Sequence, residues 1–519
     1  MMIGKSLQKI RQYPILILLA ISMLIGLFTF RDYGLSWDEP LFYDYAKAIG
    51  YAYSPSEWFS GNFNLENAYG PSASDHGNRG PAYILLAREP ESLLEWLGLD
   101  SASAWHLINF LTLQLGIYLF YRLSKRWMNE PAALISTALF AWQPLLWGHT
   151  FINPKDPPFL VFFVGAMCFG FEMVDELAQT GKYKTQKLLL AAFFLGIATS
   201  IRVLGPLAGL LVCIYGLSKA TNATALIWIK NLALYTAITI LIAFITWPYL
   251  WPDPIHRFLE AFGFMSDNPT QLRVLFNGAL YRADDLPRRY LPVLLGLTLT
   301  EPVWILFFIG IIIAAIQVRR EKLLTLALVL LWFIVPLVYV LLRRPPMYDG
   351  YRHFLFILPP IFVIAGLGLE KLFTWIKPRW ANVSLVLVIF LPSIIGIIQL
   401  HPYEYTYYNS FVGGTGGAFR KFETDYWLTC YKEAVETYQT QKPVSATMYV
   451  NREAYIAATY ADKDITVLER RGAINEIKSG DLILIDTRAN EDLKIYRDMP
   501  TVLEVGRAGA TFCVIKRIQ

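Results

Sequence analysis

Long apolar runs alternate with polar segments along most of the chain. The apolar runs recur between residues 13 and 399 and are of the length that an α-helix needs to cross the core of a bilayer. They predict about eleven membrane-spanning helices. We place these spans at 13–30, 105–123, 132–148, 157–174, 188–200, 204–217, 231–248, 300–318, 323–341, 354–372 and 382–399.

The apolar stretch 188–217 predicts two short helices, although one tilted helix is the alternative. Arg202, Gly205 and Pro206 interrupt it. Irregular backbone at membrane depth is tolerated where it faces protein or a cavity, which favours the break. A single helix here would move every later loop to the other side of the membrane.

The pattern of hydrophobic and polar residues changes after residue 399. The runs "VSATMYV", "DLILID" and "TFCVIKRI" predict strands, and "NREAYIAATYA" and "NEDLKIYRDM" have helical character. We therefore predict a mainly α polytopic membrane domain over 1–399 and a small extracytoplasmic α/β domain over 400–519. The glycine-rich segment 412–422 is interpreted as a joint between them.

Composition and cysteine content narrow the class of protein further. The chain has 519 residues, of which 55% are hydrophobic and 17% are charged, and its mean hydropathy is +0.39. These values exclude an ordinary soluble protein. Four cysteines are too few for a disulfide framework. Cys430 and Cys513, both in the C-terminal segment, either form one disulfide or remain thiols.

The basic residues predict the orientation. Every short loop on one side carries Lys or Arg, as the positive-inside rule requires of cytoplasmic loops. The N-terminus is then cytoplasmic, and the first apolar run is a retained span, because no small-x-small cleavage site follows it. The segments 31–104, 149–156, 249–299, 342–353 and 400–519 are then predicted to lie outside, so we expect any chemistry on that face.

The outer segments before residue 400 contain mainly Arg as their basic residue, and three of them contain candidate chemical groups. Guanidinium suits phosphate oxygens, although snorkelling at the interface is the alternative. The carboxylates Asp38 and Glu39 follow the first span, and Lys155 and Asp156 occupy a short outer turn. Helix capping is the alternative for all three acids. Arg343, Arg352 and His353 crowd a further outer loop, where anionic lipid head groups are the alternative partner.

The order and sidedness of these segments resemble the GT-C superfamily of membrane glycosyltransferases. Within it, they are similar to the branch of the protein O-mannosyltransferases and the lipid A aminoarabinose transferase. The resemblance covers the membrane region and rests on "WDE" after the first span, "NPKD" in the next outer loop, "DGYRH" before a late span, and "HPYEYTYYNSFVGG" after the last span. The "HPP" element of several relatives is missing, and "SDHGNRGPAY", with His76, stands in a similar place.

The resemblance implies a polyprenyl-phosphate sugar as donor and inverting transfer to an acceptor hydroxyl at the outer face. Asp38 would be the base, with Asp156 as the second acid of the site. Glu39 would shape the site or hold a divalent cation such as Mg²⁺ or Mn²⁺, and His76 would lie near the acceptor. The implied cations around the leaving phosphate are Lys155, Arg202, Arg343, Arg352 and His353.

The sugar, a hexose or a pentose, and the acceptor, a protein, lipid or glycan, stay open, as does the oligomeric state. The C-terminal segment is too short for the β-trefoil of eukaryotic relatives, which favours the cytoplasmic membrane of a bacterium or archaeon. We expect no nucleic-acid partner. The alternatives are a transporter or lipid flippase, a scaffold or receptor, and an O-antigen-ligase-like transferase. A transporter would need polar groups near the midplane of several spans, and Arg202 is the only strong one.

Overall fold

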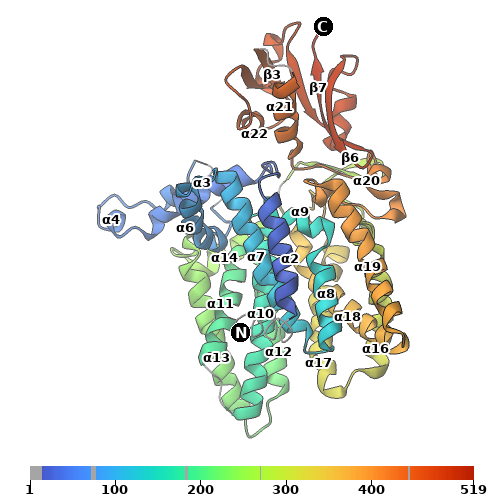
Figure 1. Ribbon diagram of the computed structural model, residues 1–519. Coiled ribbons are helices and arrows are strands. Elements are labelled where there is room, and N and C mark those ends of the chain that lie inside the picture. Colours follow the sequence, from blue (N-terminus) through green and yellow to red (C-terminus); the bar gives the residue numbers. More distant parts are fainter. Residues whose placement is uncertain (1–13, 72–76, 182–184, 269, 442–444) are drawn as a thin grey trace, which may run out of the picture.

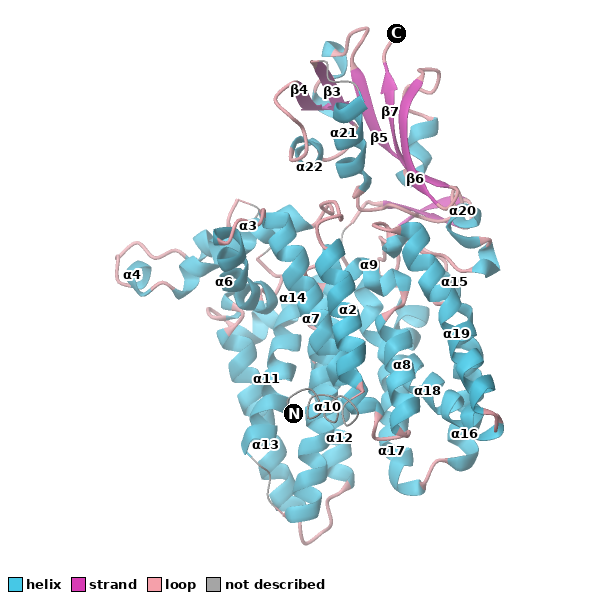
Figure 2. Cartoon of the chain, viewed as in Figure 1, coloured by secondary structure: helices cyan, strands magenta, loops and turns pink. Residues whose placement is uncertain are grey.

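A bundle of long helices and a five-stranded sheet at one end of it make up the protein (Figure 1). The computed structural model describes residues 14–71, 77–181, 185–268, 270–441 and 445–519. Helices dominate the chain up to Leu400, and the sheet is formed after that residue (Figure 2). The change from helices to a sheet therefore falls near residue 399, where the sequence pattern predicted it.

All eleven apolar segments predicted as spans lie on helices. These helices are α2 (Ile15–Thr29), α7 (Ser101–Ser124), α8 (Glu130–Ala141), α9 (Pro144–Ile152), α10 (Asp156–Thr180), α11 (Thr185–Ile201), α12 (Pro206–Ser218), α13 (Ala225–Ile245), α16 (Glu301–Gln317), α17 (Arg320–Arg343), α18 (Leu358–Trp375) and α19 (Arg379–Leu400). The segment 132–148 covers most of two helices, α8 and α9, because Pro144 begins a new helix.

Not every one of these helices is long enough to cross a bilayer by itself. Within the described residues, five helices meet criteria of length and apolar composition, and a sixth span arises if the bent pair α15 (Tyr290–Thr298) and α16 is counted as one. The chain is therefore a multi-pass membrane protein, and the count of eleven spans stays a prediction.

The break between α11 and α12 falls where the sequence placed it. Four residues, 202–205, separate the two helices and carry Arg202 between them. The chain turns tightly here, since a Cβ on Gly205 would lie 2.5 Å from the backbone nitrogen of Thr199. The turn leaves the long side chain of Arg202 at the end of α11 rather than in the middle of a continuous helix.

The segments that were predicted to lie outside the membrane form shorter elements. They include α3 (Glu39–Ile49), α4 (Pro55–Trp58), α6 (Ala82–Trp96), α14 (Pro254–Ser266), and the hairpin of β1 (Arg273–Phe276) with β2 (Ala279–Arg282). The segment with α4 projects sideways from the bundle (Figure 1). Two segments frame the site described below: α3, and the 3-10 helix over Arg352–Ile357 that leads into α18.

The C-terminal sheet has the strand order β4-β3-β5-β7-β6. Its strands are β3 (Ala446–Val450), β4 (Ile465–Glu469), β5 (Leu482–Asp486), β6 (Thr501–Arg507) and β7 (Ala510–Arg517). β3 pairs in parallel with β4 and β5, and β7 pairs antiparallel with β5 and β6. The helices of this part are α20 (Gly414–Ala418), α21 (Cys430–Gln441) and α22 (Ala454–Ala458).

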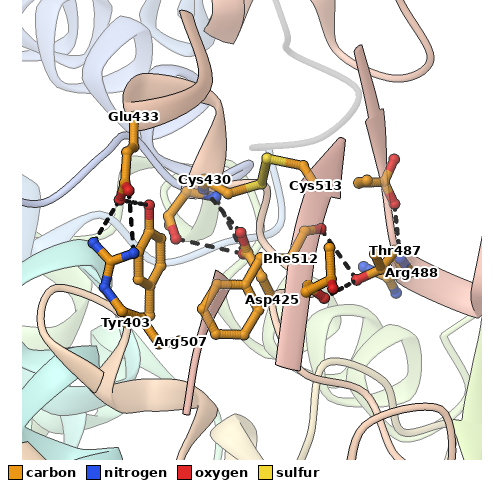
Figure 3. Close-up of a disulfide and its surroundings, with 12 residues drawn as sticks. Tyr403, Asp425, Cys430, Glu433, Thr487, Arg488, Arg507, Phe512 and Cys513 are labelled. Carbon is orange, nitrogen blue, oxygen red and sulfur yellow. Dashed lines mark hydrogen bonds and ion pairs between the residues drawn. A yellow bond between two sulfur atoms is a disulfide. The ribbon is translucent and has the colours of Figure 1, made fainter. Parts of the chain in front are cut away.

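The three predicted strands are β3, β5 and β7, while β4 and β6 were not predicted. The segment "NEDLKIYRDM", which was given helical character, does not form an α-helix. Its first residues belong to the 3-10 element Arg488–Leu493, in which Asn490 has non-helical backbone angles. A disulfide joins Cys430 at the start of α21 to Cys513 in β7 (Figure 3). It settles the alternative that the sequence left open for these two cysteines.

Candidate active site

A cavity of about 270 Å³ is lined by residues of α3, α11, α12, α14 and α17 and of the loops beside them. One group of its lining side chains is charged or polar, and another, from α12, α14 and α17 and the turns beside them, is apolar. The charged and polar group includes Asp38, Asn78, Arg79, Lys155, Arg202, Arg352 and His353. The apolar group includes Leu204, Leu207, Phe262, Met265, Val335, Pro336 and Tyr339. Val335 is also 44% exposed, so the apolar wall reaches the surface of the bundle at α17.

Asp38 precedes the first residue of α3 and directs its carboxylate to the cavity. Its side chain forms no capping hydrogen bond with the helix. Its Oδ2 instead lies 2.9 Å from Nη1 of Arg352, and 21% of its side chain is exposed. Of the two adjacent acids in "WDE", only Asp38 lines the cavity.

Glu39 turns away from the cavity and is fully buried. Its carboxylate accepts hydrogen bonds from the backbone N–H of Ser36, at 2.6 Å, and from the hydroxyl of Tyr43, at 2.7 Å. Nε2 of His106, on α7, lies 3.0 Å from the same group. These contacts attach the start of α3 to α7, which is a structural role that the sequence pattern did not suggest.

Asp156 begins α10, where a negative charge is favoured by the helix dipole. The side chain of Asn153 organises the turn: its oxygen accepts from the backbone N–H groups of Lys155 and Asp156, and its amide donates to Asp156 Oδ2 at 3.0 Å. Asp156 pairs with Arg202 and lies 3.5 Å from Arg352. It is buried behind these two arginines and holds them at the wall of the cavity.

Arg352 lies among three carboxylates. Besides Asp38 and Asp156, Oδ2 of Asp349 is 3.2 Å from its Nη2. The guanidinium packs over the ring of Trp427 at 4.8 Å, with Tyr348 at 5.4 Å. A guanidinium with such a set of partners has one fixed orientation.

Two further basic side chains, Arg79 and Lys155, line the cavity. The ion pairs among the described residues include Arg202 and Arg352 but neither Arg79 nor Lys155. Burial lowers the pKa of Lys155 well below its usual range, and the charges of Arg202 and Arg79 lower it further. An anion in the cavity would oppose these effects.

The loop that carries Arg79 packs closely against α11. A Cβ on Gly80 would lie only 1.3 Å from the backbone oxygen of Ser200, so only glycine fits this approach. Arg79 was missed by the sequence reasoning, although it lies in the "HGNRGP" segment that was considered for His76. The short "RG" step, a cation before a glycine, is the signal that could have found it.

The remaining predicted residues are placed differently. His353 lines the cavity and packs its ring edge-on to Tyr348, with centroids 5.1 Å apart. Arg343, in the last turn of α17, is exposed and does not line the cavity. His76 lies outside the described residues. Asp349, which was not singled out, comes from the Arg/His loop that the sequence did indicate.

The described residues do not form a ready metal site. In the part of the chain that the structure describes, no three His, Cys, Asp or Glu side chains come together as ligands for an ion. Asp38 and Asp156 are each paired with a guanidinium group, and Glu39 is engaged by His106 and Tyr43. We therefore derive no step through a divalent cation, and the metal-binding role of Glu39 stays a prediction.

Solved structures of other proteins have a fold similar to that of this chain. No family model and no curated protein matches the sequence. Among solved structures, ArnT from Cupriavidus metallidurans in the apo state aligns with a TM-score of 0.52 and 14% identity, over 97% of this chain and 98% of that one. The same ArnT bound to undecaprenyl phosphate aligns with a TM-score of 0.49 and 11% identity, over 96% and 97% of the two chains.

An oligosaccharyltransferase from Archaeoglobus fulgidus, in the apo form, aligns with a TM-score of 0.51 and 11% identity. The alignment covers 93% of this chain and 70% of the archaeal one. Identities this low establish the fold alone. The chain therefore has the fold of the GT-C membrane glycosyltransferases, as the order of its outer motifs indicated.

Proposed function

We propose that this protein is an inverting glycosyltransferase that moves a sugar from a polyprenyl-phosphate donor to an acceptor hydroxyl. One observation carries the proposal: a single cavity combines the carboxylate of Asp38, a cluster of cations and an apolar wall that reaches the bundle surface. The cations suit a phosphate, the apolar wall suits an isoprenoid chain, and the carboxylate suits an acceptor hydroxyl.

The charges of the cavity favour an anionic leaving group. Arg202 and Arg352 are balanced by Asp156 and Asp38. Arg79 is an additional cation, and an anion in the cavity would favour the charged form of Lys155 as well. The phosphate of a sugar donor becomes more negative when its bond to the sugar breaks. Cations fixed beforehand around that phosphate therefore stabilise the transition state more than the bound donor. ArnT from Cupriavidus metallidurans, which has this fold, has been crystallised with undecaprenyl phosphate.

The reaction would proceed in one displacement. Asp38 accepts the proton of the acceptor hydroxyl while the oxygen forms a bond to the anomeric carbon of the sugar. The bond between that carbon and the phosphate oxygen breaks on the opposite face, which inverts the configuration. The electron pair leaves with the polyprenyl phosphate, and Arg352, His353, Lys155, Arg202 and Arg79 surround the developing charge.

We place the site at the outer face of the cytoplasmic membrane of a bacterium or archaeon. The basic inner loops support a cytoplasmic N-terminus and an external C-terminal domain. The transferred sugar is a hexose or a pentose, and the acceptor is a protein, a lipid or a glycan. A reporter fused after Gln519 that is active only in the cytoplasm would overturn this orientation.

Transfer by purified protein in liposomes tests the function. Labelled polyprenyl-phosphate sugars are offered to the wild type and to Asp38→Asn, which we expect to lose about 10²- to 10⁴-fold in turnover. Asp44→Asn is the matched control, because Asp44 is an exposed carboxylate on the same helix. Full turnover by Asp38→Asn would show that Asp38 is not the base. Absence of transfer by the wild type with every donor would refute the function.

A further inference from the structure

A chain of alternating buried charges leads from the C-terminal sheet to the cavity. Nη2 of Arg488, just after β5, lies 2.8 Å from Oδ1 of Asp349. The other oxygen of Asp349 is 3.2 Å from Arg352, which in turn is 2.9 Å from Asp38. The side chain of Arg488 is 1% exposed. The charge that balances Asp349 thus comes from the C-terminal part of the protein.

Arg488 is held firmly at both ends. Its Nη1 donates to the backbone oxygen of Tyr426 at 2.8 Å, and its own backbone N–H donates to Asp486 Oδ1 at 3.0 Å. The residue before it, Thr487, donates from its backbone to the oxygen of Phe512 at 2.9 Å. Phe512 adjoins the cysteine of the disulfide, and these groups lie together in Figure 3. The guanidinium therefore presents a fixed positive charge to Asp349.

The same part of the chain also supports the residue next to Asp38. The guanidinium of Arg488 lies over the ring of Trp37, 5.4 Å from its centroid. The backbone N–H of Trp37 donates to the oxygen of Trp427 at 3.0 Å. The indole of Trp427 donates to Asp349 Oδ2 at 3.0 Å and also packs beneath Arg352. The C-terminal part thus contacts both sides of the Asp38–Arg352 pair.

We propose that Arg488 is a positioning residue of the active site, which acts through Asp349 to keep the Arg352 guanidinium directed at Asp38 and the donor phosphate. The C-terminal domain is then a required part of the active site. The inference rests on the proposed function. Its physical reason is competition: Asp349 is buried, and without Arg488 its charge would be balanced mainly by Arg352. Arg352 would turn toward Asp349 and away from the reacting groups.

A purely structural role for Arg488 is the rival explanation, and Arg420 provides a matched control for it. Arg420 forms a two-pronged pair with Asp492, with both N–O distances 2.6 Å. Asp492 belongs to the same 3-10 segment as Arg488, Arg488–Leu493, and Arg420 does not line the cavity. Replacing Arg420 perturbs the attachment of this segment and leaves Asp349 with its partner.

The first test compares Arg488→Met, Arg488→Lys and Arg420→Met in the full chain, by kcat and by KM for donor and acceptor. We expect Arg488→Met to lower kcat roughly 10- to 100-fold, since small displacements of positioned groups have effects of that size. The KM of Arg488→Met for the acceptor should change by no more than about twofold. The kcat of Arg420→Met should also change by no more than about twofold. Arg488→Lys should recover part of the loss, because a charge still faces Asp349. Full kcat in Arg488→Met, or an equal loss in Arg420→Met, would overturn the inference.

A double variant tests the route through Asp349. Asp349→Asn removes the charge that would draw Arg352 away, so combined with Arg488→Met it should cause no further loss and should restore part of kcat. Losses that multiply would show that the two residues act independently. The amount of folded protein is checked for each variant by size-exclusion chromatography in detergent.

Binding of a short-chain polyprenyl phosphate separates this inference from the proposed function. If the wild type transfers no sugar, the proposed function is refuted. Binding of the polyprenyl phosphate then tests the inference about Arg488 by itself. Arg488→Met should then weaken binding about tenfold, and Arg420→Met should leave it unchanged. Equal affinity in Arg488→Met and the wild type, or no binding by the wild type, would overturn the inference.

Discussion

Replacing Arg352 by methionine should lower the free energy of unfolding. The contacts in the structure put the expected loss near the lower end of the range for broken buried ion pairs. Loss of one partner of a buried ion pair costs about 3–5 kcal/mol. Here Asp349 would keep Arg488 and Trp427, and Asp156 would keep Arg202 and Asn153. We therefore expect a loss of about 3 kcal/mol in the free energy of unfolding.

The third carboxylate, Asp38, loses its arginine and keeps contact with solvent. Its side chain is 21% exposed, so water screens part of the uncompensated charge. Combining Arg352→Met with Asp38→Asn should therefore recover only about 1 kcal/mol. A larger recovery would mean that Asp38 is held in a less polar environment than its exposure indicates.

The measurement is unfolding of the full chain in mixed micelles by titration with SDS, followed through tryptophan fluorescence. Arg344→Met is the control, because Arg344 belongs to the same outer loop, is 47% exposed in its side chain and pairs only loosely, at 3.7 Å, with Asp285. It should change the free energy of unfolding by less than about 0.5 kcal/mol. A loss below about 1 kcal/mol for Arg352→Met would refute the view that Arg352 organises the three carboxylates.

Three further changes test other parts of the structure. Burial, together with the charge of Asp349, raises the pKa of Glu423 to about 7 against the opposing effect of Arg488. The folded state then binds this proton more tightly than the unfolded chain, so stability falls as the pH rises from about 4.5 to 7. Glu423→Gln should remove that fall and gain up to about 3 kcal/mol at pH 8, and parallel pH profiles for the two proteins would contradict the assignment. Cys513→Ala should cost about 2–4 kcal/mol, with the same loss in reduced wild type, and a wild type insensitive to reductant would show that Cys430 and Cys513 are thiols. Glu39→Gln should cost about 1–3 kcal/mol and leave any dependence on divalent cations as in the wild type, whereas a changed dependence would favour Glu39 as a metal ligand.

The helical segments could be located from the sequence because apolar runs of this length have few alternatives. The positions at which one helix ends and the next begins were harder to predict. The turn at Arg202 was visible because a charge, a glycine and a proline coincide there. The division of 132–148 into α8 and α9 was not predicted, because the apolar pattern continues across it and only Pro144 marks the new helix. The strand β4 was missed because it is a short run between the charged residues of "DKD" and "ERR", and β6 was missed because Glu504 and Gly506 interrupt its apolar pattern.

Part of the candidate site could be predicted from the sequence. The residues that lie next to predicted spans could be grouped, whereas a residue far along the chain in the C-terminal segment could not. Asp38, Lys155, Arg202 and Arg352 could be grouped because each lies at the outer end of a predicted span, and the structure brings all four to one cavity. Arg488 offered no comparable signal. It lies in the polar stretch "DTRANED", which resembles any surface turn, and only the folded chain brings it to Asp349.

Asp38 and Glu39, the acidic pair after the first span, are adjacent in the sequence but have different partners in the structure. Successive residues at the start of a helix point about 100° apart, so Asp38 and Glu39 cannot serve one site together. Glu39 holds the segment against α7 through His106, while Trp37 on the other side is held by Trp427. Asp38 is thus fixed between two anchors from distant parts of the chain and meets Arg352 without capping its own helix. In the reaction that we propose, Asp38 placed in this way would depend on the helix bundle and on the C-terminal segment together, so a change in either should reduce transfer before it unfolds the protein.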